Sequence, residues 1–198
     1  VARGVGSLMP SYSSFNGVKM HGYRYWLHDV LIDEIGFEGF VISDWDAVYQ
    51  LPQSNALDIR AAVLAGVDMF MVPNSWSTFI STLTADVNGG QVPMSRIDEA
   101  VGRILRVKFA LGLFENPLAQ RDLMPQIRSL AHRTLARQAV QESLVLLKNN
   151  AFLPLSTNST FCINGSGSNS VTSQSGGWTL GWNAPLRTPT GETIRQAL

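Results

Sequence analysis

Apolar residues in the first half of the chain form short runs that are separated by stretches with helical spacing. The runs at residues 7–12, 39–44 and 67–72 end near polar residues, glycine or proline, as buried strands commonly do. Their starts lie about 30 residues apart, which leaves room for a crossover helix in each gap. This order predicts a βαβαβ unit with three buried, parallel strands.

Helical spacing fills the gaps between these runs. The first amphipathic segment ends at Gly36 and the second at Gly66, in the position where glycine commonly follows a helix. A third segment ends at Gly89, and a fourth starts at Ser95 as the expected N-cap and ends at Gly112. The apolar positions of these predicted helices are Leu27, Val30, Leu31, Leu57, Ala61, Leu64, Phe79, Ile80, Leu83, Val87, Ile97, Val101, Ile104, Leu105 and Leu111.

A break in the periodicity predicts a domain boundary. Residues 116–127 carry two prolines and no helical spacing, which is typical of a linker. Beyond it the pattern predicts a helix over residues 129–142 and strands over residues 144–148 and 161–163. The expected division is a domain over residues 1–115, the linker at 116–127, and the opening part of a second domain over residues 128–198.

The length of the first domain limits its fold. A complete (β/α)8 barrel needs roughly 250 residues, about twice the number that precedes the linker. We interpret residues 1–115 as the last three βα units of such a barrel, with three units of an open doubly wound sheet as the alternative. The chain starts without Met or a signal-peptide pattern, so we expect the true N-terminus to lie upstream.

Charge and composition exclude several classes of partner. Fifteen Lys and Arg balance fifteen Asp and Glu, so the chain has no basic field for nucleic acid or an anionic membrane. No apolar stretch is long enough to span a membrane. The three histidines lack metal-ligand spacing, and the Gly-Ser segment after residue 163 lacks the third glycine of a dinucleotide loop. We expect no metal, no cofactor and a neutral substrate.

Asp44 is the candidate for chemistry. It directly follows a strand predicted to be buried, and reacting groups in parallel α/β folds lie at the carboxyl ends of strands. Position alone favours a capping role for this carboxylate. However, Trp45 follows it, and Tyr12 and Met71 end the neighbouring runs. Aromatic faces beside a carboxylate suit a sugar, so we expect Asp44 to act on a carbohydrate.

Several segments occur in a characteristic order and spacing along nearly the whole chain. They are MPSYSSFNGVKMH at residues 9–21, GFEGFVISDW at 36–45, AGVDMFMVP at 65–73, PMSRIDEA at 93–100, RILRVKF at 103–109 and SLVLLKN at 143–149. Together they resemble glycoside hydrolase family 3, in particular its β-glucosidases and exo-β-glucanases. The resemblance implies the C-terminal part of a TIM-like barrel followed by the start of an α/β sandwich domain.

The resemblance also implies a retaining mechanism with Asp44 as nucleophile. Such a mechanism needs a second carboxyl group roughly 5–5.5 Å away as acid and base. In the family this group belongs to the sandwich domain, and neither Glu142 nor Glu192 matches its position. We therefore expect the acid/base to lie outside these residues, and the 198-residue chain alone to be inactive.

The family match assigns substrate contacts to several aromatic residues. Trp182, in a Gly-Gly-Trp segment, is expected to face Trp45 across the sugar. Trp178 either adds to this platform or covers the edge of the second core. Tyr12 is expected beside the nucleophile, and Met71 is expected to line the glucose subsite.

The implied substrates are β-linked glucosides or gluco-oligosaccharides, cleaved to release glucose from non-reducing ends, and the resemblance favours a periplasmic or secreted protein. Gln50 stands where plant-like members carry Arg, and Ser175 where related segments often have Cys. Two alternatives remain: a non-catalytic carbohydrate-binding remnant, and a β-N-acetylhexosaminidase of the same family. That second branch carries a histidine acid/base in a barrel loop, which has no counterpart here.

Overall fold

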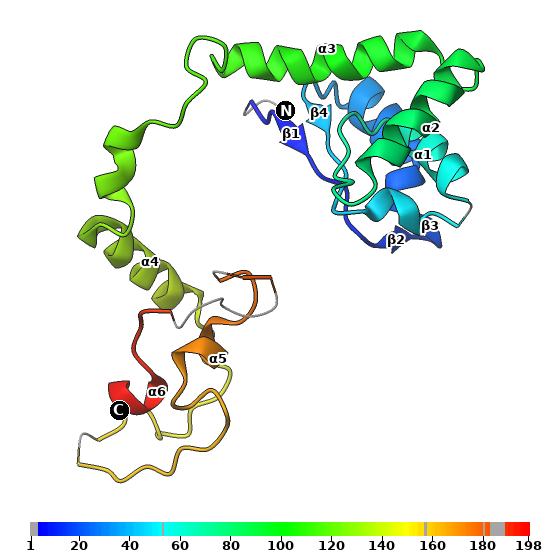
Figure 1. The fold of residues 1–198 in the computed structure, drawn as a ribbon. Coiled ribbons are helices and arrows are strands. Elements are labelled where there is room, and N and C mark those ends of the chain that lie inside the picture. The colour runs from blue at the N-terminus through cyan, green and yellow to red at the C-terminus, as the bar shows by residue number, and fades with distance from the viewer. Residues whose placement is uncertain (1–3, 53, 157, 180, 183–188) are drawn as a thin grey trace. The chain divides into compact units, whose positions relative to one another are not determined.

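The computed structural model describes residues 4–52, 54–156, 158–179, 181–182 and 189–198 (Figure 1). The chain divides into two compact units, Val1–Pro125 and Gln126–Leu198. The dividing point falls within the segment 116–127, which contains the 3-10 helix η4 (Arg121–Gln126). The two units are described separately below.

The first unit contains parallel strands in the predicted order. β1 (Ser7–Leu8) pairs with β4 (Phe40–Val41), with Ser7 opposite Phe40 and Leu8 opposite Val41. An isolated parallel bridge joins Ile42 to Met69. The parallel arrangement is thus confirmed, but the strands are shorter than predicted, and residues 67–72 contribute this bridge and no regular strand.

Burial of the strands is uneven, which corrects the prediction that all three are buried. Val41 is fully buried, whereas Ser7 and Met69 are exposed. Among the described residues β1 has only β4 as a strand neighbour, so its outer edge is uncovered. The two strands approach closely at Gly39, where a Cβ would collide with the carbonyl oxygen of Gly6.

A β-hairpin that the sequence analysis missed follows β1. β2 (Ser14–Phe15) and β3 (Val18–Lys19) pair antiparallel around Asn16 and Gly17. Both turn residues have positive φ, 50° and 83°, as a two-residue type I′ turn requires. The hairpin leads directly into the 3-10 turn η1 (Met20–Gly22).

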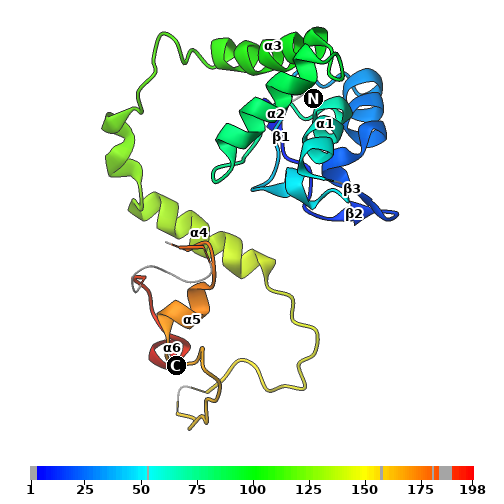
Figure 2. The same ribbon diagram turned by 45° about the vertical axis from the view of Figure 1, so that its right-hand side comes forward.

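The predicted helices of the first unit are present. They are η2 (Tyr25–Glu34), α1 (Asn55–Ala65), α2 (Trp76–Asn88) and α3 (Met94–Ala110), with the 3-10 turn η3 (Ala47–Gln50) between β4 and α1. η2 is a π-helix, with hydrogen bonds such as that from the Ile35 N–H to the Val30 carbonyl. Figures 1 and 2 show α1 and α2 side by side and α3 passing close to β4.

Two details of these helices correct the predictions. α1 buries Ile59, Ala62 and Val63, whereas Leu57, predicted to face the core, is exposed. Because α1 is apolar on most sides, its periodicity does not determine which face is inside. α3 starts one residue before Ser95, after Pro93, so Ser95 lies within the first turn and is not the N-cap.

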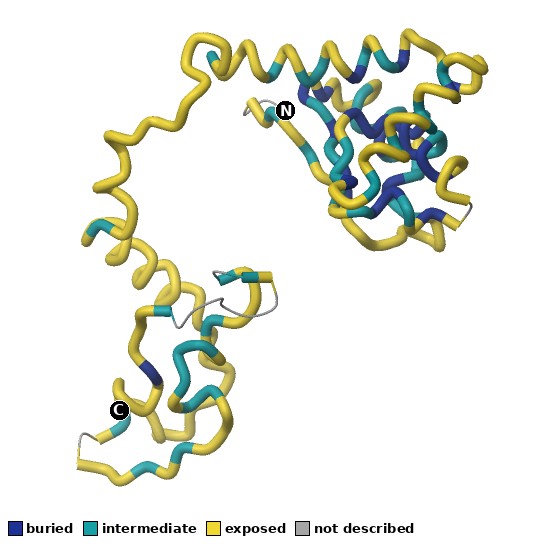
Figure 3. Tube along the Cα trace, in the orientation of Figure 1, coloured by how far each residue is buried: buried dark blue, intermediate teal, exposed yellow. Residues whose placement is uncertain are grey.

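One hydrophobic core holds the first unit together (Figure 3). Its buried members come from η2, β4, η3, α1 and the segments around them, and helices α2 and α3 pack partly buried side chains against it. The buried residues are Leu27, Phe37, Val41, Val48, Leu51, Ile59, Ala62, Val63, Ala65, Val67, Val72 and Val92. No described helix is both long and apolar enough to cross a membrane.

A buried ion pair lies beside this core. The Arg96 Nη2 donates to Asp68 Oδ1 at 2.7 Å, and Asp68 Oδ2 accepts the Val41 N–H at 2.8 Å. The same guanidinium donates to the carbonyls of Val63 and Val67. Burial raises the pKa of Asp68, although the Val41 N–H and Arg96 act in the opposite direction.

The second unit consists of α4 (Leu130–Ser143), α5 (Val171–Ser175) and α6 (Ile194–Ala197) with long irregular connections. The predicted helix is confirmed, and the Ser129 hydroxyl caps it by accepting the His132 N–H. Residues 144–148 and 161–163 are not strands, and the apolar residues 144–147 are exposed. Strands need neighbours to satisfy their backbone groups, and the described part of this unit supplies none.

Replacing Arg96 tests the buried pair. Arg96→Met should lower the free energy of unfolding by about 3–5 kcal/mol, because loss of one partner leaves a buried carboxylate uncompensated. Urea unfolding followed by circular dichroism measures the change. Arg106→Met is the matched control, since Arg106 is exposed on the same helix and makes one 3.3 Å bond to the Glu38 carbonyl. It should change stability by less than about 0.5 kcal/mol. Equal effects of the two substitutions would contradict the prediction.

Candidate functional site

Asp44 lies where the central strand leaves the sheet. The Ile42 N–H donates to the Leu8 carbonyl at 3.0 Å, and the Ser43 N–H donates to the Met69 carbonyl at 2.8 Å. Strand pairing therefore continues on both sides up to the residue before Asp44. Its carboxylate is half-buried at the carboxyl end of the parallel strands, where α/β enzymes place their reacting groups.

His21 holds the backbone of Asp44. Its Nε2 accepts the Asp44 N–H at 2.9 Å, and the histidine is only 3% exposed. An accepting Nε2 assigns the proton of the neutral ring to Nδ1. Burial lowers the pKa of His21, and Lys19 lowers it further, while the Asp44 carboxylate acts to raise it. The ring is therefore neutral near pH 7.

A second side chain holds the Trp45–Asp46 peptide. The Tyr12 hydroxyl donates to the Trp45 carbonyl at 2.8 Å, and the Tyr12 ring meets His21 edge to face with centroids 6.5 Å apart. The Trp45 N–H donates to Asp44 Oδ1 at 2.6 Å. This contact engages only one carboxylate oxygen. It does not cap η3, whose N-cap is Asp46 and lacks a side-chain cap, so the capping role that position alone favours is wrong. No described residue donates a hydrogen bond to Oδ2.

The next turn is fixed against the neighbouring segment. Asp46 adopts a left-handed conformation with φ of 53°, and its N–H donates to the Met71 carbonyl at 2.8 Å. The Met71 N–H in turn donates to the Ser43 hydroxyl at 2.8 Å. The backbones around Asp44 and Met71 are thus joined on both sides of the nucleophile candidate.

A hollow of about 300 Å³ adjoins this turn. Trp45, which is 48% exposed, and Met71 both line it, together with Phe70, Val72, Pro73 and Trp76. The structure thus brings three of the predicted contact residues, Tyr12, Trp45 and Met71, around Asp44.

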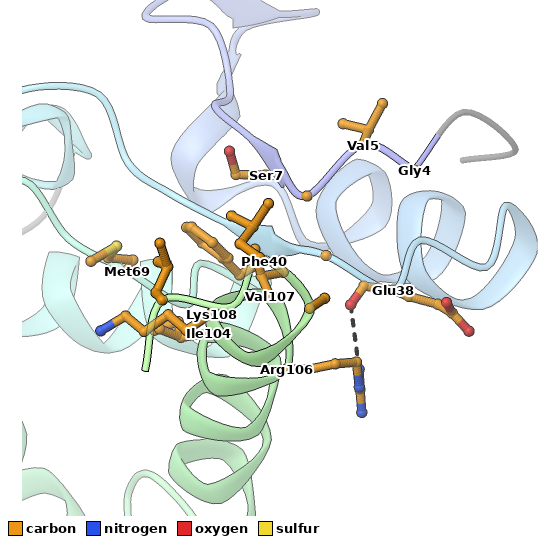
Figure 4. A pocket seen from close by; sticks show the side chains of 15 residues that line it. Gly4, Val5, Ser7, Glu38, Phe40, Met69, Ile104, Arg106, Val107 and Lys108 are labelled. Atoms are coloured by element: carbon orange, nitrogen blue, oxygen red, sulfur yellow. Dashed lines mark hydrogen bonds between the residues drawn. The ribbon is translucent and has the colours of Figure 1, made fainter. Parts of the chain in front are cut away.

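A larger apolar hollow, of about 580 Å³, lies elsewhere (Figure 4). It is lined by Val5 and Ser7 at the start of β1, by Glu38 and Phe40 at the start of β4, and by α3 residues that include Val107. This is the amino end of the strands, away from Asp44. In barrel enzymes that end contributes to stability rather than catalysis.

Trp178 and Trp182 lie together in the second unit. Their ring centroids are 4.7 Å apart, and the Trp178 N–H donates to the Trp182 carbonyl at 3.0 Å. Trp178 is 79% exposed and Trp182 59% exposed, so neither covers a core among the described residues. They form an exposed aromatic pair.

Other polar groups have different roles. Gln50 accepts a 3.4 Å hydrogen bond from the Lys19 ammonium group. His28, Asp29 and Asp33 come within metal-ligand distance of one another on η2, a clustering that the sequence analysis did not foresee. At the surface Arg24 pairs with Asp29 at 3.5 Å and lies 3.3 Å from His28 Nδ1.

The sequence analysis missed His21. Its position depends on the hairpin closed by Asn16 and Gly17. The hairpin reverses the chain, so that η1 lies next to the end of β4. Asn-Gly between short apolar segments is a strong hairpin signal. That dipeptide was the available indication that residues after it return towards Asp44.

Comparison with known proteins identifies the family. Residues 1–107 match the family described as the glycosyl hydrolase family 3 N-terminal domain. This chain belongs to glycosyl hydrolase family 3. The N-terminal domain of family 3 is a TIM-barrel-type fold, so the parallel strands of the first unit belong to a barrel and not to an open doubly wound sheet.

Family 3 relatives resemble nearly the whole chain. A lysosomal β-glucosidase of Dictyostelium discoideum is 37% identical over 190 residues, covering 90% of this chain and 23% of the relative. A periplasmic β-glucosidase of Salmonella typhimurium is 35% identical over 187 residues, 88% of this chain and 24% of the relative. The chain thus spans about a quarter of the length of these family 3 relatives.

A solved structure of the family is also similar. The exo-1,3/1,4-β-glucanase of a Pseudoalteromonas species superposes with a TM-score of 0.84 and 38% identity, over 98% of this chain and 25% of that one. A mutant β-glucosidase of Listeria innocua, solved in complex with laminaribiose, gives a TM-score of 0.68 and 30% identity over 77% of this chain and 22% of that one.

The neutral, buried His21 predicts a pH effect on stability. The pKa of His21 in the folded protein lies below its ordinary value of 6.5. The neutral ring therefore makes its full contribution to the free energy of unfolding above pH 6.5, and this contribution is lost as the pH falls through the lowered pKa. Urea midpoints measured from about pH 7.5 to about pH 5 should fall, and His21→Gln should remove part of this fall. His132→Gln, which changes an exposed histidine on α4, is the control and should preserve the fall. A pH profile unchanged by His21→Gln would show the prediction to be wrong.

Proposed function

We propose that these residues form part of a retaining β-glucosidase or exo-β-glucanase in which Asp44 is the nucleophile. The observation that carries this proposal is the half-buried Asp44 carboxylate at the carboxyl end of the parallel strands, beside the hollow lined by Trp45 and Met71. The names of the relatives, β-glucosidases and an exo-1,3/1,4-β-glucanase, support the substrate class. That class is β-linked glucosides or gluco-oligosaccharides.

In the proposed first step, Asp44 Oδ2 attacks the anomeric carbon of a terminal glucose. The bond from that carbon to the leaving-group oxygen breaks, and a carboxylic acid protonates this oxygen. Water then attacks the glycosyl ester from the side of the departed group, gives its proton to the same carboxylate, and releases glucose and free Asp44. Oδ2 is the proposed attacking atom because Oδ1 already accepts the Trp45 N–H.

The surrounding side chains have proposed roles in binding. Trp45 offers an apolar face to one side of the sugar, and Met71 lines the same hollow. Tyr12 lies beside the nucleophile with its hydroxyl on the Trp45 carbonyl. We further propose that Trp182, with Trp178 next to it, supplies an aromatic face for the sugar. The exposure of both rings and their mutual contact support a platform that is free for a ligand.

The domain assignment is part of the proposal. Residues 1–115 would be the last three βα units of the barrel, residues 116–127 the linker, and residues 128–198 the opening of an α/β sandwich domain. The acid/base would then lie outside these residues. Glu142 supports this view, because it is exposed on α4 and accepts a 2.7 Å bond from Gln138.

Covalent trapping tests the role of Asp44. A 2-deoxy-2-fluoro-β-glucoside with a dinitrophenolate leaving group should add one glycosyl mass to the complete gene product, because fluorine slows release of the ester. Mass spectrometry of peptides should locate the adduct on Asp44, and Asp44→Asn should form none.

Asp98→Asn, which changes an exposed carboxylate on α3, is the control and should be trapped like the wild type. An adduct on another residue would overturn the proposal. Binding of gluco-oligosaccharides without an adduct would favour the non-catalytic carbohydrate-binding alternative. Trapping by a 2-acetamido reagent alone would favour the hexosaminidase.

The isolated 198-residue chain should turn over an aryl β-glucoside poorly, if at all. Loss of a general acid alone typically lowers the rate by a factor on the order of 10²–10⁴. Release of nitrophenolate by this chain and by the complete gene product, at equal concentration, measures the difference. Equal turnover by the two would show that the acid/base lies within these residues.

A further inference from the structure

We infer that His21 is a positioning residue for the nucleophile: its Nε2 fixes the peptide N–H of Asp44 and so the direction in which the carboxylate leaves β4. The inference rests on the proposed role of Asp44. It concerns a histidine from a different segment, 23 positions earlier in the chain.

The contact is to the backbone of the candidate nucleophile itself. Strand pairing fixes the chain up to Ser43, whose N–H and hydroxyl both bond the segment at Met69 and Met71. The Asp44 N–H is the next donor along the chain, and it turns away from the sheet to His21. The histidine thus controls the first backbone group that strand pairing leaves free.

The ring has little freedom to move. His21 is almost completely buried, and the Tyr12 ring packs against it edge to face. Tyr12 also donates to the Trp45 carbonyl, so the segment that carries both side chains holds the chain before and after the Asp44–Trp45 peptide. Two side chains from one short segment therefore set the orientation of the carboxylate.

The neutral state of the ring matters for this contact. A protonated ring would place an Nε2 proton against the donating Asp44 N–H, and the hydrogen bond would be lost. The charged groups that face His21 are the Asp44 carboxylate and, from its own segment, Lys19. Burial outweighs the attraction of the carboxylate and lowers the pKa of the imidazole, which keeps the acceptor available.

A packing role alone would have a different signature. An apolar side chain of similar size would fill the space but leave the Asp44 N–H without an acceptor. The backbone would then shift to reach water, and a displacement of about 1 Å at a reacting group costs roughly 10²-fold in rate. An amide acceptor near the place of Nε2 would keep the carboxylate in position.

The test uses the fluoroglucoside with the dinitrophenolate leaving group on the complete gene product. This leaving group needs no acid, so the trapping rate at saturating reagent reports the attack by Asp44. His21→Leu should lower this rate by about 10–10²-fold with a smaller change in the half-saturating concentration. His21→Gln should restore it to within about threefold of the wild type. His28→Gln, on η2 and away from Asp44, should leave it unchanged.

A second measurement examines the hydrogen bond directly. Nitrogen-15 NMR of the wild type should show the Nδ1–H tautomer for His21, with Nε2 unprotonated. An Nε2–H tautomer would overturn the inference. It would also fail if His21→Leu trapped at the wild-type rate, or if His21→Gln were as slow as His21→Leu. In both of these cases the wild type would still be trapped on Asp44, and the proposed function would stand. A wild type that forms no adduct would overturn both.

Discussion

The contact between Asp68 and Arg96 organises the first unit. Asp68 Oδ2 accepts the Val41 N–H, and Arg96 reaches the carbonyls of Val63 and Val67 from α3. The pair therefore joins β4, the end of α1 and the following segment through their backbone groups. Burying two charges is costly, so the pair contributes little net stability. Its main effect is to fix the backbone segments that it bonds relative to one another. Three residues after Val41 comes Asp44.

Side chains that bind backbone groups continue this arrangement into the site. His21 and Tyr12 bond backbone groups of Asp44 and Trp45, and the Ser43 hydroxyl accepts the Met71 N–H of the neighbouring segment. Side chains that hold the backbone can fix the chain where regular strand pairing ends, which is where a barrel needs its reactive group exposed. Short strands are therefore compatible with a well-fixed backbone at Asp44.

The sequence predicted much of this unit but not all of it. Periodicity located the helices, the parallel order and the position of Asp44, because these depend on local patterns. It failed for the buried face of α1, which is apolar on most sides, and for residues 144–148, which need neighbouring strands. It also missed His21, because a hydrogen bond across 23 residues depends on how the hairpin returns the chain.

Asp44 and the aromatic pair of the second unit have separate sets of described hydrogen bonds. Every described hydrogen bond to Asp44 comes from the first unit, and His21 and Trp45 supply those to its N–H and Oδ1. The aromatic pair of Trp178 and Trp182 belongs to the second unit, and its described backbone hydrogen bond joins its two members. When the folded unit itself holds a carboxylate in place, the entropy of orienting that carboxylate is lost during folding and not during catalysis. Under the proposed function, the direction of the attacking oxygen is therefore set by His21 and Trp45 of the first unit.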